Sequence, residues 1–172
     1  MTAQEQISSG KKYQRASDNA LAAGLGVQVT LDQAKYAMFK VNQDYANQSL
    51  STADSQLLNL HNMMANFQKI LVQAGNDTLG IDNRKILGQQ AQGIAKAMNL
   101  LFQATDANGQ PIFETDPAMQ VVAVEVAEGV TVKARLTPQE CQGIADSMTA
   151  ITAMANRLAG GQALSEGDYT AI

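Results

Sequence analysis

The sequence predicts a mainly α-helical protein, an elongated bundle of long heptad-patterned helices with a small β-hairpin. Apolar side chains recur with a seven-residue repeat from about residue 18 to residue 74, and no proline interrupts the chain from there until Pro111. Alternate residues are apolar between residues 122 and 136, which is the period of a strand. Aromatic residues make up only 5% of the chain, so the core must be built mainly from aliphatic, helix-forming side chains.

The first predicted helix spans about residues 18–74. Ser17 and Asp18 offer N-cap chemistry at its start, and Gly75-Asn76 suits its end because both residues tolerate the left-handed conformation. One apolar stripe consists of Leu31, Ala34, Met38, Val41 and Tyr45, and a second of Ala46, Leu50, Ala53, Leu57, Leu60, Met64, Phe67, Leu71 and Ala74. The stripes differ in phase, which predicts one very long helix with a local change of supercoil, or two helices that meet near Tyr45. A continuous helix would be roughly 80 Å long and would imply a rod.

A second helix is predicted after this turn, with Asp82 as its cap. Its apolar stripe consists of Leu87, Ile94, Ala97, Leu101 and Ala104. Gly88 and Gly93 lie inside it, and we interpret them as positions where another helix can approach closely. The run Asp106-Ala107-Asn108-Gly109 indicates the end of the helical segment.

A β-hairpin is predicted within residues 111–136. The residues that recur at every second position are Val122, Val124, Val126, Val130, Val132, Ala134 and Leu136. Ala127-Glu128-Gly129 separates the two runs and supplies a turn that contains glycine. Because an isolated hairpin is only marginally stable, we expect it to lie against the helices or to recruit another strand.

A third helix follows Thr137-Pro138-Gln139-Glu140, which has the sequence of a capping box with proline at the first helical position. Its apolar stripe consists of Cys141, Ile144, Met148, Ile151, Ala155 and Leu158. Gly160-Gly161 ends the helix, and the tail to Ile172 is expected to be loose. The chain is thus divided into a polar lead-in (1–17), a rod domain of two helices (18–110), a hairpin region (111–136), and a third helix with its tail (137–172).

The distribution of charge argues against nucleic acid and membrane partners. The net charge is −4 and the basic residues form no cluster, whereas nucleic acid binding requires a positive surface. No run is long and apolar enough to span a membrane, and residues 1–6 lack the features of a secretory signal. A single cysteine excludes an intramolecular disulfide.

Two residues could in principle carry catalysis, and neither is in a suitable context. His61 is the only histidine, and it lies beside the apolar stripe of the first helix, as an ordinary flanking residue would. Cys141 lies on the apolar stripe of the third helix, and its neighbour Glu140 would oppose formation of a thiolate. We interpret Cys141 as a small core residue.

Two short motifs resemble ligand sites, but each lacks residues that such a site requires. Gly24-Leu25-Gly26 lacks the third glycine of a dinucleotide fingerprint and does not follow a strand. Asp106, Asn108 and Gly109 resemble part of a calcium loop, but the glycine comes too early and the final carboxylate is missing. The sequence therefore predicts no catalytic, cofactor or metal site, and a structural protein rather than an enzyme. A helical adaptor or chaperone that binds a partner helix is an alternative.

Four segments in order resemble the flagellin superfamily. Residues 7–12 (Ile-Ser-Ser-Gly-Lys-Lys) and 17–23 (Ser-Asp-Asn-Ala-Leu-Ala-Ala) are similar to its N-terminal signature. Residues 50–57 and 70–79 are similar to its first long helix and to the turn that ends it. The resemblance covers about residues 4–113 and implies a rod like the flagellin D1 domain.

Within the superfamily, residues 106–113 and 124–132 resemble the hook-associated protein 3 type, and flagellin itself is the alternative because the helical motifs are shared. The family begins with a further apolar helical segment and ends with a long helix that pairs with it. We therefore expect this sequence to be a core fragment that lacks the terminal segments, and to be monomeric in dilute solution.

The resemblance implies a structural component of the bacterial flagellum, a junction protein that links hook to filament through helix packing. Its implied partners are other flagellar axial proteins (hook-associated protein 1 and flagellin), copies of itself, and an export chaperone. The implied location is extracellular, after export by the flagellar secretion system without a cleaved signal peptide. Candidate contacts with neighbouring subunits are Arg15, Asp18, Asn19, Arg84 and Lys85.

Overall fold

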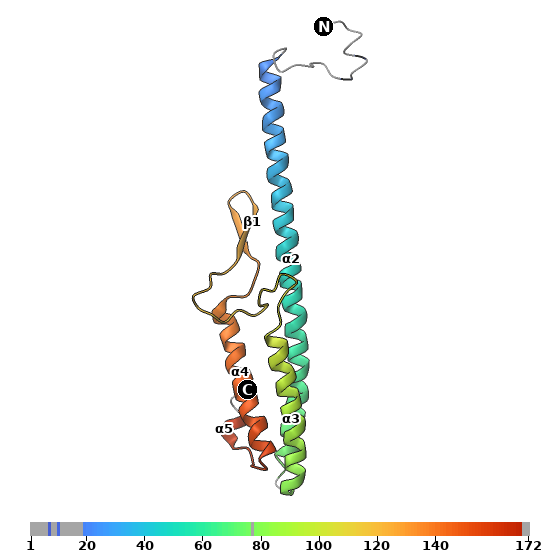
Figure 1. Cartoon of the computed structure of the whole chain (residues 1–172), viewed down its shortest axis with the longest axis vertical. Coiled ribbons are helices and arrows are strands. Elements are labelled where there is room, and N and C mark those ends of the chain that lie inside the picture. The colour runs from blue at the N-terminus through green and yellow to red at the C-terminus, as the bar shows by residue number, and fades with distance from the viewer. Residues whose placement is uncertain (1–6, 8–9, 11–18, 77, 170–172) are drawn as a thin grey trace.

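The computed structural model describes residues 7, 10, 19–76 and 78–169, and it shows an elongated rod of helices (Figure 1). The elements are α2 (Ala20–Ala74), α3 (Ile81–Phe102), β1 (Ala123–Ala127), β2 (Val130–Lys133), α4 (Pro138–Ala159) and α5 (Glu166–Tyr169). The two strands form one antiparallel sheet. The predicted fold class, mainly α with a small β-hairpin, is confirmed.

The helix α2 is a single helix of 55 residues, so the alternative of two helices meeting near Tyr45 is wrong. Its N-cap is Asn19, whose Oδ1 accepts a hydrogen bond from Ala22 N at 3.0 Å. The predicted caps Ser17 and Asp18 lie outside the described residues. Gly75 ends the helix as predicted, but with φ −70° rather than in the left-handed region, and its N–H donates to Leu71 O at 2.9 Å.

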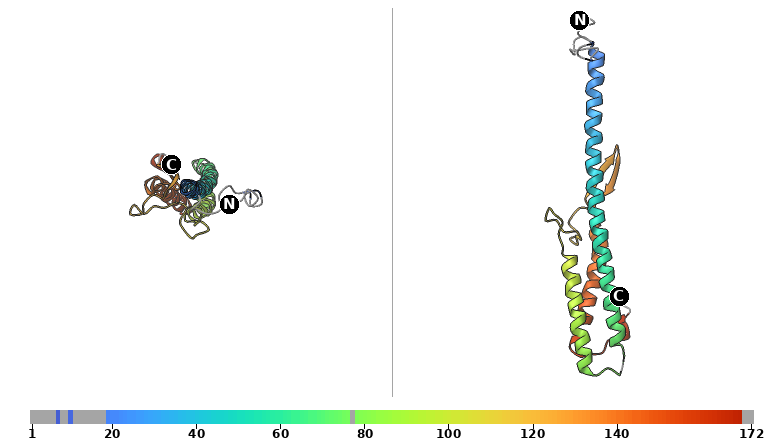
Figure 2. Two further views of the ribbon diagram at one scale, coloured as in Figure 1. Left: turned by 90° about the horizontal axis from the view of Figure 1, so that it is seen from above. Right: turned by 90° about the vertical axis from the view of Figure 1, so that its right-hand side faces the viewer.

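The C-terminal half of α2 packs with α3 and α4 as a three-helix bundle, seen along its axis in Figure 2. The core residues from α2 are Leu60, Phe67, Ile70, Leu71 and Ala74; those from α3 are Ala91, Ala95 and Met98; those from α4 are Cys141, Met148, Ile151, Met154, Ala155 and Leu158. These side chains come largely from the second stripe of α2 and from the predicted stripe of α4. The three-four spacing therefore identifies the buried faces of these two helices.

The buried face of α3 differs from the predicted one. The residues fully buried on it are small or flexible: Gly88, Ala91, Ala95 and Met98. The larger residues of the predicted stripe, such as Leu87 and Leu101, flank this line and are half-buried. Small side chains occupy the centre because α4 approaches α3 closely there, and close approach leaves no room for Leu or Ile.

The start of α3 also differs from the prediction. The N-cap is Gly80, which makes no side-chain hydrogen bond, and Asp82 lies in the first turn. A carboxylate in the first turn interacts favourably with the positive end of the helix dipole, so Asp82 contributes there without acting as a cap.

The hairpin and the start of α4 follow the prediction. The turn at Glu128-Gly129 has φ +69° at Gly129, a conformation that glycine adopts without steric cost. A bulge lies between Glu125 and Ala127. The capping box is formed: Glu140 N donates to Thr137 Oγ1 at 3.2 Å and Thr137 N donates to Glu140 Oε2 at 2.7 Å.

The described part of the C-terminal tail is more ordered than predicted. Residues 162–169 fold back into α5, and Leu164 packs against the core. Arg157 Nη1 forms an ion pair with Asp168 Oδ1 at 2.7 Å, and the Asp168 carboxylate also accepts from Ser165 N. One apolar contact and one polar cluster are enough to fix a short segment that sequence pattern alone assigns to a loose end.

Substitution at Gly88 is expected to destabilise the bundle. A Cβ at Gly88 would lie 2.0 Å from Ala159 N, which is backbone and cannot move away cheaply. We expect Gly88→Ala to lower the free energy of unfolding by about 1–3 kcal/mol, measured by urea denaturation, although alanine is the better helix former. Gly93→Ala is the matched control, because nothing lies within 4 Å of its Cβ position, and it should stabilise by up to about 1 kcal/mol. Equal effects of the two variants would contradict the close α3–α4 contact.

Acid is expected to destabilise the protein through carboxylates that act as caps. Hydrogen bonds from Thr137 hold the pKa of Glu140 below its ordinary value of 4.5, and the pKa of Asp168 is lowered chiefly by Ser165. A lowered folded-state pKa means that this stability is complete above the unfolded pKa and is lost as pH falls through the folded one. Unfolding free energy should therefore be flat above about pH 5 and fall below it. Glu140→Gln should reduce this slope, and Gln139→Ala, in the same turn, should leave it unchanged.

Candidate interaction surface

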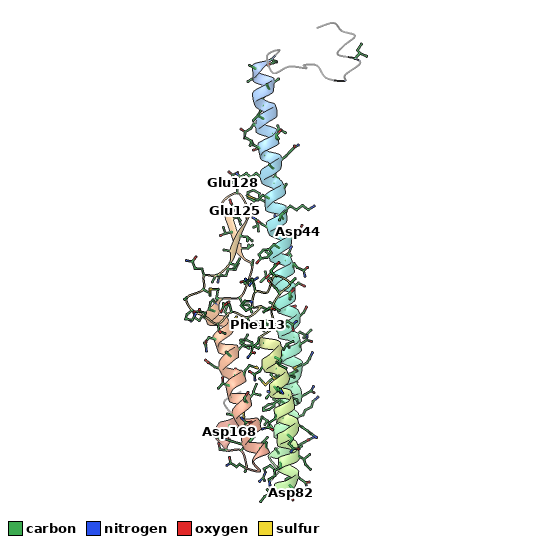
Figure 3. All side chains as sticks on the ribbon, in the orientation of Figure 1. Asp44, Asp82, Phe113, Glu125, Glu128 and Asp168 are labelled. Carbon is green, nitrogen blue, oxygen red and sulfur yellow. The ribbon has the colours of Figure 1, made fainter. Side chains whose placement is uncertain are left out.

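The N-terminal half of α2 projects beyond the three-helix bundle (Figures 1 and 3). It carries a row of apolar side chains that are largely exposed. We call this row the α2 seam; it consists of Val27, Leu31, Ala34, Met38, Val41 and Tyr45, of which Tyr45 alone is half-buried. The exposed fractions are 61% for Val27, 59% for Leu31 and 66% for Val41. Its spacing alternates four and three residues, which is the spacing of a surface that packs against another helix.

The first predicted stripe therefore exists but is not buried within this chain. At about 1.5 Å per residue, α3 and α4 are each roughly 33 Å long, and α2 is roughly 80 Å. The two shorter helices lie along the C-terminal half of α2 and leave its N-terminal half uncovered (Figure 1). A contiguous exposed apolar row of this kind marks an interaction site more often than an accident of composition.

The hairpin covers a different face of the same part of α2. Asn42 Nδ2 donates to Glu125 O at 2.7 Å, and Gln43 Nε2 donates to Val126 O at 2.8 Å. These bonds satisfy backbone carbonyls on the outer edge of β1. The prediction that the hairpin lies against the helices is confirmed, and the contact is made by β1.

Two further contacts fix the hairpin tip over α2. Phe39 is buried to 4% exposure beneath it, and Lys35 Nζ lies 5.9 Å from the centre of the Phe39 ring. Lys35 Nζ also forms an ion pair with Glu128 Oε1 at 2.6 Å. Their hydrogen bond lowers the pKa of Glu128 and raises the pKa of Lys35. Both groups are solvent-exposed, so this pair orients the tip and adds little stability.

The loop between α3 and the hairpin is held by Arg135. Its Nη2 forms an ion pair with Asp106 Oδ2 at 2.6 Å, and its Nη1 donates to Pro111 O at 3.1 Å. The hydrogen bond that Gln110 N donates to Asp106 Oδ1 is the main cause of the lowered pKa of Asp106. Phe113 stacks on Phe102, with ring centroids 5.2 Å apart. Asp106 thus closes the turn predicted at residues 106–109.

A cavity of about 330 Å³ lies between this loop and α2. Its walls include Tyr45, Thr52, Gln56 and Arg135, and the carboxylate in its lining, Asp106, is paired with Arg135. Across residues 19–76 and 78–169 no group of three or more His, Cys, Asp or Glu is placed to hold a metal ion. The cavity is a gap where the loop crosses the long helix.

Neither of the two residues considered for catalysis lines this cavity. Cys141 has no exposed surface, and burial raises the pKa of its thiol, with a smaller contribution from the Glu140 carboxylate. A buried thiol of raised pKa is a poor nucleophile, so Cys141 is a core residue. His61 is exposed on α2.

The residues predicted to contact neighbouring subunits have varied positions. Arg84 is half-buried and donates to Gly161 O at 3.5 Å and Leu79 O at 3.4 Å, so it closes the end of the bundle rather than facing outward. Asn19 caps α2. Lys85 is exposed, and Arg15 and Asp18 lie outside the described residues. Sequence reasoning missed the role of Arg84 because its partners are carbonyls of two separate turns.

The length and hydropathy of the helices bear on whether the chain crosses a membrane. Among the helices of the described residues, none combines the length and the hydropathy needed to cross a bilayer.

A long helix with an exposed heptad seam, a second helix folded back on it and a hairpin against its flank together define a structural rod of the flagellin type. Residues 1–116 match the family described as the bacterial flagellin N-terminal helical region, and the chain belongs to this family.

Two curated relatives carry the name flagellar hook-associated protein 3. The protein from Salmonella typhimurium is 34% identical over 109 residues, which is 63% of this chain and 34% of that protein. The Escherichia coli protein is 33% identical over the same share of each chain. The chain therefore spans about a third of the length of these relatives.

Solved structures show the same fold. Xanthomonas campestris FlgL aligns with a TM-score of 0.54 over 63% of this chain and 41% of that chain, at 22% sequence identity. A candidate flagellar hook-associated protein from Vibrio parahaemolyticus aligns with a TM-score of 0.63 over 91% of this chain and 78% of that chain, at 16% identity. The second alignment covers more of the chain than the first, so the likeness of fold extends further than the sequence resemblance.

Loss of the Asn42 amide is expected to release the hairpin. Asn42→Ala removes the hydrogen bond to Glu125 O, and hydrogen exchange of the hairpin amides should become faster while that of α4 stays unchanged. Asn47→Ala, at an exposed position five residues further along α2, is the control and should change neither. Unchanged exchange in the Asn42 variant would mean that Gln43, Lys35 and the burial of Phe39 hold the hairpin without it.

Proposed function

We propose that this chain forms the rod of a flagellar hook-associated junction protein, a structural component that links hook to filament through helix packing. The single observation that carries the proposal is the α2 seam, an exposed heptad surface on a chain of the flagellin family. The names of the two curated relatives described above favour the junction over the filament.

The seam explains how a rod of this kind could join neighbours. Helices that present a heptad row pack side by side, and each such contact buries apolar surface worth about 25 cal/mol per Å². Subunits with different faces joined head to tail give open helical assemblies rather than closed dimers. We propose that the seam pairs with a helix from outside the described residues.

The proposal extends to partners and place. The partners would be hook-associated protein 1, flagellin, copies of this chain and an export chaperone, and the place would be the extracellular part of the flagellum. We further propose that the isolated chain stays monomeric in dilute solution, because one unpaired heptad row without a matching helix gives only a weak contact. A structural, non-enzymatic role accords with the burial of Cys141 and the exposure of His61.

Antibody labelling of intact flagella tests the proposal. Labelling at one point between hook and filament would support the junction role. Labelling along the whole filament would favour flagellin instead, and the absence of label from flagella would overturn the proposal.

Substitutions in the seam test its mechanism in the same cells. Leu31→Asp combined with Met38→Asp should abolish filament attachment, because charged side chains cannot be buried in a helix–helix contact without a large cost. Thermal unfolding of the purified chain should shift little, since neither residue belongs to the three-helix core. Gln33→Asp with Asn47→Asp adds the same charge at exposed polar positions of α2 and should leave attachment intact. Attachment that survives the seam variant would refute the role of the seam.

A further inference from the structure

The outer edge of β2 is an unpaired strand edge on a hairpin that α2 holds in place. The sheet has only two strands, β1 packs against α2, and the four residues of β2 are all exposed. Figure 2 shows the hairpin beside α2 in its right-hand view. An edge of this kind can pair with another chain unless something blocks it.

The register identifies which backbone groups point outward. Ala134 N donates to Val122 O at 2.8 Å, so residues 122 and 134 form a hydrogen-bonded pair. Pair types alternate along an antiparallel ladder, so Val124 and Val132 are bonded to each other. The N–H and C=O groups of Thr131 and Lys133 therefore point away from β1. The same reasoning turns the carbonyl of Glu125 outward on β1, where it accepts from Asn42.

The two outer edges of the hairpin thus differ in their hydrogen bonds. On β1, side-chain amides of α2 occupy the outward carbonyls of Glu125 and Val126. On β2, no hydrogen bond within the described part of the chain reaches the main-chain groups of Thr131 or Lys133. These groups are spaced for one more strand.

The faces of the hairpin specify the chemistry of that strand. One face carries valines, of which Val122 and Val132 are each 39% exposed and Val130 is 50% exposed. The other face carries Lys133, and the residue across from it on β1 is Ala123, so the hairpin supplies no carboxylate directly opposite this charge. The nearby carboxylates are hydrogen-bonded elsewhere: Glu125 Oε1 accepts from Gly129 N, and Glu140 closes the capping box. The hydrogen bonds from Thr137 lower the pKa of Glu140 most, and the charge of Lys133 lowers it least.

We propose that the outer edge of β2 binds an extended segment of a partner protein as a third strand, with an acidic residue beside Lys133 and apolar residues on either side of it. The acidic side chain pairs with Lys133, and the apolar side chains extend the valine face. β1, with the sequence Ala-Val-Glu-Val-Ala, pairs with the inner edge of β2 and places its Glu opposite Thr131. A segment of the same sequence on the outer edge, shifted so that its Glu lies beside Lys133, would place its two valines on the valine face. This inference does not depend on the proposed flagellar role.

A short peptide tests the inference on the full chain. The probe is acetyl-Ala-Val-Glu-Val-Ala-amide, followed by NMR chemical shifts and amide exchange. We expect the largest shifts and slowed exchange at Thr131 and Lys133. Shifts that map to the α2 seam, or no shifts at millimolar peptide, would overturn the inference.

Two pairs of variants separate edge pairing from nonspecific contact. Thr131→Pro removes an outward N–H without breaking the bonds to β1, because proline is tolerated at an edge position, and it should abolish binding. Thr131→Val keeps the N–H and should retain binding. Lys133→Glu should weaken binding of the acidic peptide about fivefold. It should strengthen binding of the peptide that carries Lys in place of Glu by a similar factor. Binding that survives Thr131→Pro, or an unchanged order of the two peptides, would refute the proposed strand.

Self-association is the remaining outcome. If the Thr131 and Lys133 amides shift with protein concentration in the absence of peptide, the edge pairs with a second copy, and the proposal of an acidic partner segment is wrong.

Discussion

Other helices of the chain bury the apolar side chains of α2 only along its C-terminal half, and this limit determines the rest of the structure. Phe67, Met98, Ile151 and Leu158 are almost completely buried where three helices meet, and this core fixes α3 and α4 to the C-terminal half of α2. The close contact at Gly88 sets the distance between α3 and α4. Beyond the reach of the two shorter helices, α2 continues as a single helix, and its apolar row stays in contact with solvent.

This arrangement separates stability from assembly. The three-helix core contains the apolar burial that folds the chain, and few of its residues are available to a neighbour. The α2 seam lies outside that core and can be occupied or left free without unfolding the bundle. A structural subunit benefits from this separation because it must remain folded both before and after it meets its neighbours.

The hairpin and the loop before it belong to the boundary between these two regions. Arg135 joins the loop to the start of α4, and Asn42 with Gln43 joins the hairpin to α2 at the level where the bundle ends. Polar contacts suit this boundary because they orient the hairpin over a helix whose apolar side faces elsewhere. They also leave one edge of the sheet free, and a rigidly held free edge is better suited to recognition than a mobile one.

The sequence by itself determined the local elements, because each is encoded by residues near one another in the chain. Heptad spacing identified α2 and the buried face of α4, the Thr137–Glu140 box identified the start of α4, and the valine alternation identified the hairpin. Only the tertiary structure decided which apolar faces are covered. The stripe at Leu31 and Met38 has the same pattern as the buried one, and periodicity cannot reveal that the partner helices are too short to reach it. The small-residue face of α3 and the inward role of Arg84 were likewise missed, because they arise from distances between helices that no single segment encodes.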